Sequence, residues 1–325
     1  MESIPDRESS DTGEYVAFEE SVARFFEEEP RTAVRVEFGA LSHRGLVRHD
    51  NEDHYFVVRR RRVRDVLLSN LPVERLNQAE QEAYSLLVAD GLGGHAFGEL
   101  ASYLALRTAW DLGGNEIKWA VKMNRRESDE LKLKAAVLFG LLDRALQSAA
   151  KAQPQLAGMG TTLTVCYTTG PELFVLHAGD SRAYLYRGGA LRRLTRDHTV
   201  AQEMIDAGMA EPESDAVRSE RHVLTNYVGG GSVKVDFEHH RLAQSDRLLL
   251  CTDGLTDLVS EGEIAALLKA HPTPKDACTA LVDRALDCGG FDNITVVLAN
   301  YTIPEVADTA DCEVADTADW PARPG

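Results

Sequence analysis

The chain has 325 residues, of which 44% are hydrophobic, and a formal net charge of −17. This length allows one large domain or two modest ones, and the acidic balance argues against general binding to nucleic-acid phosphates. The charge is concentrated at the ends. Residues 1–30 hold ten acidic and two basic side chains, and residues 305–325 hold six acidic and one basic. The acidity therefore says little about a central active site.

The cysteine pattern and the hydropathy exclude several other classes of protein. The five cysteines show no Cys-x-x-Cys spacing, so neither a disulfide framework nor a zinc site is predicted. The first residues lack the basic and apolar segments of a signal peptide, and no apolar run approaches the roughly 20 residues of a membrane helix. We expect a cytoplasmic monomer with no membrane or nucleic-acid partner.

Apolar periodicity divides the chain into three parts. Residues 1–30 are expected to be a mobile acidic leader, and residues 305–325, in which an acidic eight-residue unit occurs twice, a disordered tail. Residues 31–304 are predicted to form a single domain. In chain order, strands are expected at 34–40, 54–58, 86–89, 162–168, 172–178, 182–187, 190–194, 233–237, 247–252 and 294–301. Helices are expected at 96–110, 130–151, 200–207 and 261–270 and from residue 274 onward.

Two stretches of this domain are predicted to lie at its surface. The basic run 59–64 and the polar stretch that follows it indicate a solvated extension; the alternative is a basic lip that attracts anionic phosphopeptides. Residues 205–231 contain Gly208, Pro212 and three successive glycines, 229–231. A long segment of this kind is typical of a mobile flap over an active site.

The main chemical signal is a carboxylate at several junctions between a predicted strand and a turn. Asp53 and Asp292 open strands, whereas Asp90, Asp180 and Asp253 close them. Each aspartate alone is more often a turn former, so the signal lies in the joint pattern. If these groups converge, they repel one another unless cations neutralise them. An oxygen-rich set without paired Cys or His favours Mg²⁺ or Mn²⁺.

These aspartates belong to seven motifs that follow one another between about residues 40 and 299. The motifs occupy residues 48–53, 88–95, 158–162, 179–184, 194–199, 251–257 and 292–297. In sequence and order they resemble those of the metal-dependent protein serine/threonine phosphatases of the type 2C family, in particular its bacterial members. The resemblance implies an α+β fold: a four-layer α-β-β-α sandwich of two antiparallel β-sheets flanked by helices, with two metal ions at one end.

The resemblance also implies a set of metal ligands. Asp90 would bridge two Mg²⁺ or Mn²⁺ ions, and the carbonyl of Gly91 would bind one of them. Asp253 and Asp292 would hold the other ion. Asp53 and Glu52 would act directly or through water.

Two further residues complete the implied site. Arg48 would hold the substrate phosphate, for which its planar guanidinium can donate two hydrogen bonds at once. Asp180 together with Asp253 could hold a third, weaker metal ion.

The implied activity is hydrolysis of phosphoserine and phosphothreonine in proteins by direct attack of a water activated by two metals, with no phosphoenzyme. Two cations about 4 Å apart can lower the pKa of a shared water and clamp the phosphoryl oxygens for in-line attack. Two alternatives stay open: a catalytically inactive binding module with the same fold, and a broader small-molecule phosphomonoesterase.

The sequence departs from many relatives in two places. Leu92 stands where many eukaryotic members carry a histidine, so the general acid is not assigned. His43, His95 and His222 are candidates, although each is expected to be structural or solvated. The flap segment 224–229 also differs, which bears on substrate preference.

A second phosphatase chemistry is excluded by its context. Cys278 and Arg284 have the bare spacing of a cysteine-dependent phosphatase. That mechanism needs a loop of converging N–H groups and an activated thiolate, whereas residues 279–283 continue an amphipathic helix. The match is therefore predicted to be accidental.

Overall fold

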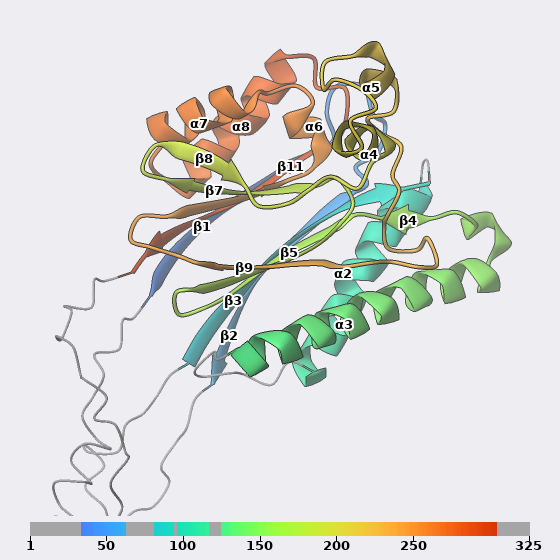
Figure 1. Cartoon of the computed structure of the whole chain (residues 1–325), viewed down its shortest axis with the longest axis horizontal. Helices are drawn as coiled ribbons and strands as arrows, with labels where there is room; N and C mark the ends of the chain where they lie inside the picture. Colours follow the sequence, from blue (N-terminus) through green and yellow to red (C-terminus); the bar gives the residue numbers. More distant parts are fainter. Residues whose placement is uncertain (1–33, 63–80, 94–95, 117–124, 304–325) are drawn as a thin grey trace, which may run out of the picture. The chain divides into compact units, whose positions relative to one another are not determined.

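In the computed structural model, residues 34–62, 81–93, 96–116 and 125–303 are described. The acidic leader and the repeat tail lie outside these ranges. Two antiparallel β-sheets face each other, and helices cover the outer face of each sheet (Figure 1). The expected four-layer sandwich of the α+β class is thereby confirmed.

The first sheet has the strand order β1-β11-β10-β7-β8. Its strands are β1 (Arg35–His43), β7 (Arg182–Arg187), β8 (Ala190–Arg193), β10 (Arg247–Cys251) and β11 (Ile294–Thr302). The second sheet has the order β2-β3-β5-β6-β9, with β4 paired to β3. Its strands are β2 (Asp53–Arg62), β3 (Gln81–Leu92), β4 (Gly160–Thr161), β5 (Leu163–Thr169), β6 (Glu172–Ala178) and β9 (Asp236–Arg241).

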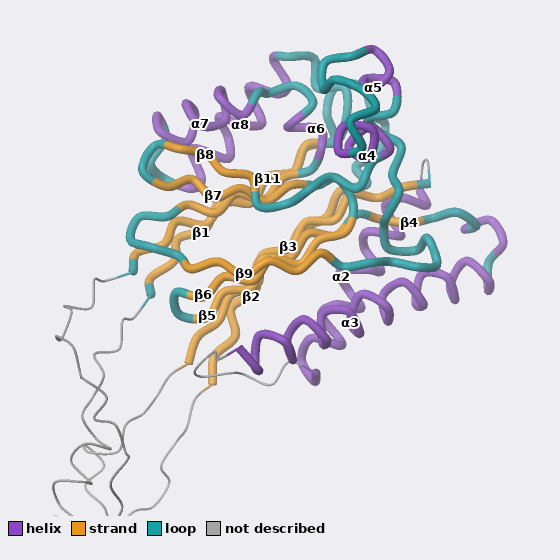
Figure 2. The backbone as a smooth tube through the Cα atoms, in the orientation of Figure 1, coloured by secondary structure: helices purple, strands orange, loops and turns teal. Residues whose placement is uncertain are grey.

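The two longest helices pack on the second sheet, and three shorter ones pack on the first (Figure 2). On the second sheet lie α2 (Ala96–Glu116) and α3 (Arg125–Ala152), followed by the short η2 (Pro154–Leu156). On the first lie α6 (Asp253–Thr256), α7 (Glu261–Ala270) and α8 (Pro274–Asp287). The flap segment contains α4 (Val200–Asp206) and α5 (Asp215–Ser219). None of the helices in the described part of the chain combines the length and apolarity required to span a bilayer.

The core consists of three apolar layers because each sheet is covered on both faces. In β3, Leu86 and Val88 point to the layer between the sheets, whereas Leu87 and Ala89 point to α2 and α3. Successive side chains of a strand face opposite sides, so a strand buried on both faces is apolar at every position. The strand β10 alternates in the same way between the central layer and α8. This continuous burial fixes the strand ends that carry the site.

Several boundaries differ from the sequence-based expectation. The basic residues 59–62 form a paired strand and not an irregular extension: they belong to β2 and pair with residues 81–84 of β3, with the side chains of Arg59 and Arg61 exposed to solvent. Arg61 donates a hydrogen bond to Glu82 across this pair, and backbone pairing thus overrides the polar composition. The rest of the run, with residues 63–80, lies outside the described residues. The strand expected at 233–237 begins only at Asp236.

The predicted hairpin and helix starts follow local chemistry. Gly188 and Gly189, between β7 and β8, both have positive φ, as the two-residue turn requires. The helix α8 begins with Thr273 as N-cap, whose hydroxyl accepts from the amide of Asp276, and with Pro274 in its first turn.

Candidate active site

Four of the predicted aspartates meet at one end of the sandwich, and they come from both sheets. Asp53 and Asp90 lie opposite each other on β2 and β3. Asp253 lies two residues after β10, at the first position of α6, and Asp292 lies two residues before β11. The hydroxyl of Thr252 donates to Asp53 Oδ2 at 2.8 Å and so joins the two sheets at this point.

The pKa values of Asp53 and Asp90 are raised by burial and by the charges of neighbouring aspartates. Burial and the nearby charges of Asp253 and Asp292 raise the pKa of Asp53 to about 7. Burial, reinforced by the charges of Asp53 and Asp253, raises the pKa of Asp90 well above its usual value. Such shifts arise when several carboxylates share one poorly solvated space. The cluster therefore favours a positive partner.

Two carboxylate oxygens provide a further test of whether this cluster fits a cation. Among the described residues, Asp53 Oδ1 and Asp253 Oδ1 are buried without a hydrogen-bond donor. Buried polar atoms are normally paired, and Mg²⁺ and Mn²⁺ prefer oxygen ligands such as these. The residues present therefore fit a divalent-cation centre.

Gly91 and Glu52 lie beside this cluster in a closely packed corner. The Gly91 amide donates to the Glu52 carbonyl at 3.2 Å. A Cβ on Gly91 would lie 2.1 Å from the Gly98 carbonyl oxygen, so no larger residue fits there. A Cβ on Gly98 would lie 2.4 Å from Glu52 Oε2 and 2.9 Å from the Gly91 carbonyl oxygen. Both oxygens thus face the same side of Gly98, as two ligands of one site would.

Arg48 lies at the mouth of the cluster. Its Nη2 donates to Asp292 Oδ2 at 2.6 Å, and about half of the arginine side chain is exposed. The hydrogen bond to Asp292 raises the pKa of Arg48, so the guanidinium stays charged. The exposed part of this cation can receive an anion from solvent.

The loop that carries Arg48 is held by a residue to which the sequence analysis gives no role. Asn293 is buried, and its Oδ1 accepts from the Glu52 amide at 2.8 Å. Its Nδ2 donates to the carbonyls of Arg44 and Asp50, each at 2.9 Å. One side chain therefore fixes both ends of the loop 44–52. The sequence signal that could have identified Asn293 is its position directly after Asp292, at the start of a predicted strand.

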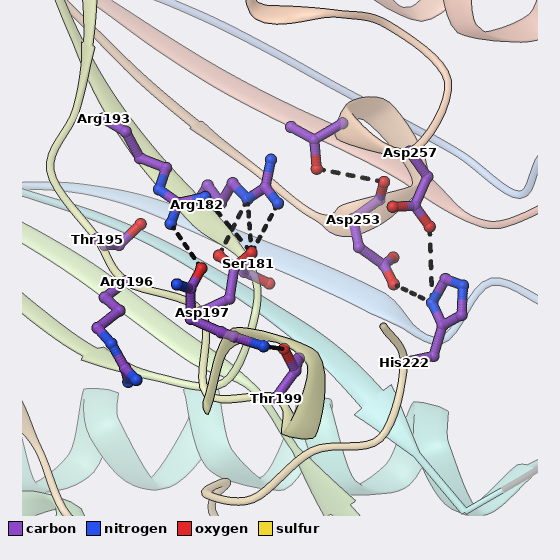
Figure 3. Close-up of polar contacts among 12 residues, drawn as sticks. Ser181, Arg182, Arg193, Thr195, Arg196, Asp197, Thr199, His222, Asp253 and Asp257 are labelled. Carbon is purple, nitrogen blue, oxygen red and sulfur yellow. Dashed lines mark hydrogen bonds and ion pairs between the residues drawn. The ribbon is translucent and has the colours of Figure 1, made fainter. Parts of the chain in front are cut away.

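A second group of polar residues lies around Asp253 (Figure 3). His222, from the flap, places its Nδ1 3.6 Å from both Asp253 Oδ2 and Asp257 Oδ2. The nearby carboxylate of Asp253, together with that of Asp257, raises the pKa of His222 to about 9. Burial and the charge of Asp253 raise the pKa of Asp180 well above its usual value. Asp257, although it lies within a motif, is not among the residues that the sequence analysis selects.

Of the other two histidines, only His43 lies within the described residues, and it does not join this group. His43 ends β1, and its Nδ1 accepts from the Gly45 amide at 3.0 Å. His95 lies outside the described residues. Of the two histidines that the structure describes, His222 lies beside the carboxylates and His43 does not.

The C-terminal end of the flap segment is attached to the body of the domain. Asp143 of α3 accepts from the amides of Gly229 and Gly231 at 2.7 and 3.1 Å. The backbones of Val228 and Thr161 exchange two hydrogen bonds of 2.9 Å. The Thr161 hydroxyl in turn donates to the carbonyl of Asp90 at 2.8 Å. A continuous set of contacts thus links α3, the flap and the carboxylate cluster.

The cysteine that matches another phosphatase spacing lies elsewhere. Cys278 is buried inside α8, and burial raises the pKa of its thiol to about 12. Arg284 forms an ion pair with Glu263 at 2.6 Å and is exposed. A buried, protonated thiol is not a nucleophile, which agrees with an accidental match.

Comparison with known proteins extends the resemblance noted in the motifs. Residues 75–284 match the family model described as "Protein phosphatase 2C". The chain belongs to the protein phosphatase 2C family. Over 271 residues it is 34% identical to the serine/threonine protein phosphatase PstP of Mycobacterium tuberculosis, a match that covers 83% of this chain and 46% of PstP. The chain therefore spans about half the length of this family member.

A second relative, and the solved structures of PstP, are matched over nearly the whole length of the compared chain. The serine/threonine phosphatase stp of Listeria monocytogenes is 31% identical over 263 residues, which cover 81% of this chain and 94% of stp. A crystal structure of the M. tuberculosis phosphatase superimposes with a TM-score of 0.66 at 32% identity and covers 82% of this chain and 98% of that one. A structure of the PstP catalytic domain in complex with two manganese ions has a TM-score of 0.65 at 31% identity, with coverage of 83% and 100%.

Proposed function

We propose that this chain is a metal-dependent phosphoprotein phosphatase that hydrolyses phosphoserine and phosphothreonine. The observation that carries the proposal is the meeting of Asp53, Asp90, Asp253 and Asp292 next to the exposed guanidinium of Arg48. A cation centre beside a phosphate-binding arginine suits phosphoryl transfer, which depends on positioning and charge stabilisation. The named activities of PstP and stp, and the two manganese ions in the PstP catalytic domain, support the same activity.

The proposed ligands lie at or next to the ends of strands from both sheets. Two Mg²⁺ or Mn²⁺ ions would be held by Asp90, the Gly91 carbonyl, Asp253 and Asp292, with Asp53 and Glu52 acting directly or through water. A third ion would be held by Asp180 and Asp253. When bound, such ions activate a water for direct attack on phosphorus and neutralise charge on the phosphoryl oxygens.

The remaining residues position the substrate and the ligands. Arg48 is proposed to bind the phosphate, to which its free N–H groups can donate in parallel. Its hydrogen bond to Asp292 orients the guanidinium towards the carboxylates. The hydroxyl of Thr252 holds Asp53 Oδ2 and leaves Oδ1 available for a ligand role. No phosphoenzyme is proposed, because water would attack phosphorus directly, and the buried thiol of Cys278 is not available as a nucleophile.

Hydrolysis of p-nitrophenyl phosphate and of a phosphothreonine peptide, with Mn²⁺ and with a chelator, tests the proposal. We expect turnover with Mn²⁺ and none with the chelator. Asp253→Asn should lower kcat at least about 100-fold because it weakens the charge and geometry of the ligand set. Cys278→Ser, the matched control, should stay near wild type.

Two other outcomes of this assay would contradict the proposal, and each would indicate a different function. Absence of turnover on every substrate despite Mn²⁺ binding would indicate a catalytically inactive binding module. Turnover of small phosphomonoesters without any on phosphopeptides would indicate a small-molecule phosphomonoesterase. The cytoplasmic location, the monomeric state and a role in signal transduction stay predictions from the sequence, as do the boundaries of the domain at residues 31 and 304.

A further inference from the structure

The loops around Arg48 and Asp292 carry an exposed apolar patch that the proposed chemistry does not use. Leu46 and Val47 are each 65% exposed, and Phe291 is 60% exposed. Within the described ranges, five large hydrophobic side chains are at least 60% exposed, and three of the five are Leu46, Val47 and Phe291. The other two are Leu133 and Met209, on α3 and in the flap segment. Isolated exposed hydrophobic residues are common, whereas a group beside a site indicates an interaction surface.

Leu46 and Phe291 pack over two neighbouring glycines, and Val47 directly follows Leu46 in the chain. The amide of Leu46 donates to the carbonyl of Gly290 at 2.7 Å. A Cβ on Gly290 would lie 3.1 Å from Leu46 Cγ, and a Cβ on Gly289 would lie 2.5 Å from Phe291 Cζ. Leu46 and Phe291 therefore rest on neighbouring glycines of one turn. We call Leu46, Val47 and Phe291 the apolar patch.

The patch is fixed next to the proposed phosphate site. Val47 directly precedes Arg48, and Phe291 directly precedes Asp292. The hydrogen bond of 2.6 Å between Arg48 and Asp292 therefore brings the two apolar segments together. An extended peptide advances about 3.3 to 3.6 Å per residue, so a side chain within three residues of a phosphate on Arg48 can reach these neighbouring positions.

We propose that the apolar patch is a substrate subsite that binds a large aliphatic or aromatic side chain within three residues of the phosphorylated serine or threonine. This inference rests on the proposed function, in which Arg48 receives the phosphate. The phosphate dianion pairs with the guanidinium, and the neighbouring apolar side chain covers Leu46 and Phe291. Phosphoproteins with only polar residues around the phosphorylated position are therefore poorer substrates than those with such a side chain.

Matched phosphothreonine peptides test the subsite with the full chain and Mn²⁺. Each pair differs only in Leu or Ala, placed two residues before or two residues after the phosphothreonine. For one of the two placements we expect kcat/KM to be about tenfold higher for the Leu peptide, which corresponds to about 1.4 kcal/mol from partial burial of one large side chain. In the double variant Leu46→Ser, Phe291→Ser this Leu/Ala ratio should fall to about one.

The ratio is measured within one protein, so a general loss of activity in the variant cancels. Leu133→Ser, a substitution of similar exposure on α3, is the control and should keep the wild-type ratio. A ratio near one in the wild type for both placements, or an unchanged ratio in the double variant, would overturn the subsite. The subsite would also be overturned if the double variant changed only the self-association of the protein in sedimentation. A second copy of the chain would then be what covers the apolar patch.

Measuring the binding of peptide analogues that cannot be hydrolysed distinguishes failure of the subsite proposal from failure of the proposed function. Phosphonate analogues of the same peptides, in which a methylene group replaces the bridging ester oxygen, cannot be hydrolysed at that bond. Tenfold tighter binding of the Leu analogue in Mn²⁺, lost in the double variant, supports the subsite even where no ester is hydrolysed. Equal binding of both analogues would refute it, even where hydrolysis is rapid.

Discussion

Replacing Asn293 by alanine should disable the site without removing any proposed ligand or substrate contact. The change deletes three hydrogen bonds of 2.8 to 2.9 Å, to the Glu52 amide and to the carbonyls of Arg44 and Asp50. Each backbone group left unsatisfied costs about 1 to 3 kcal/mol. Because part of the loop is open to solvent, we take the lower end for each group. The free energy of unfolding should then fall by about 3 kcal/mol.

The expected effect on catalysis is larger than the effect on stability suggests. Loosening the loop 44–52 displaces Arg48 and Glu52 together, and a misplacement of about 1 Å can cost about 100-fold in rate. We expect kcat/KM for p-nitrophenyl phosphate to fall by about that factor and half-saturation to require more Mn²⁺. Urea denaturation and steady-state kinetics over a Mn²⁺ titration measure the two quantities.

Asn300, at the other end of β11, offers a matched control. Its side chain also bridges, accepting from Arg247 and donating to the Pro272 carbonyl, both at 2.8 Å. Asn300→Ala should therefore cost about 2 kcal/mol of stability but leave kcat/KM within about twofold of wild type. If Asn293→Ala lost no more activity than Asn300→Ala, the loop would be held by other contacts and our reasoning would be wrong.

Three further predictions concern the flap, the response to acid and the metal. Asp143→Ala removes the acceptor of two flap amides and should cost about 2 kcal/mol of unfolding free energy, with a lower kcat/KM. Burial lowers the pKa of His177 to about 4 from 6.5; below pH 6.5 the unfolded chain binds the proton that the folded chain rejects. Stability should therefore fall by about 2 kcal/mol from pH 7 to pH 5, and His177→Gln should remove that part of the slope. Mn²⁺ at 100 times its Kd should add about 2.7 kcal/mol to wild-type stability and less to Asp253→Asn.

Each of the three predictions, for Asp143, His177 and Mn²⁺, would be contradicted by a specific result. Asp143→Asn keeps an acceptor oxygen, so a variant as unstable as Asp143→Ala would show that the flap amides are not the cause. An acid slope of unchanged size in His177→Gln would assign the effect to other groups, since Asp197 and Asp236 also face this ring. Equal stabilisation of wild type and Asp253→Asn by Mn²⁺ would place the ion away from the proposed ligands.

The sequence by itself determined the elements and the residues with the proposed ligand roles. Apolar periodicity indicated the strands of both sheets except β4 and most of β9, and the helices α3, α7 and α8, because each is buried along a regular face or on both faces. Asp90 and Asp253 could be selected because each carboxylate carries a local signal, a strand that ends on an acid and a glycine. The family resemblance then supplied the fold and the ligand set.

Only the tertiary structure decided which polar residues hold these groups in place. The bond between Glu52 and Asn293 joins residues 241 positions apart, and that between Asp143 and Gly229 joins residues 86 apart. Local patterns record propensity and burial but not the partner of a side chain across the fold. The apolar patch has the same origin, since Leu46 and Phe291 meet on Gly289 and Gly290 only after β1 has paired with β11.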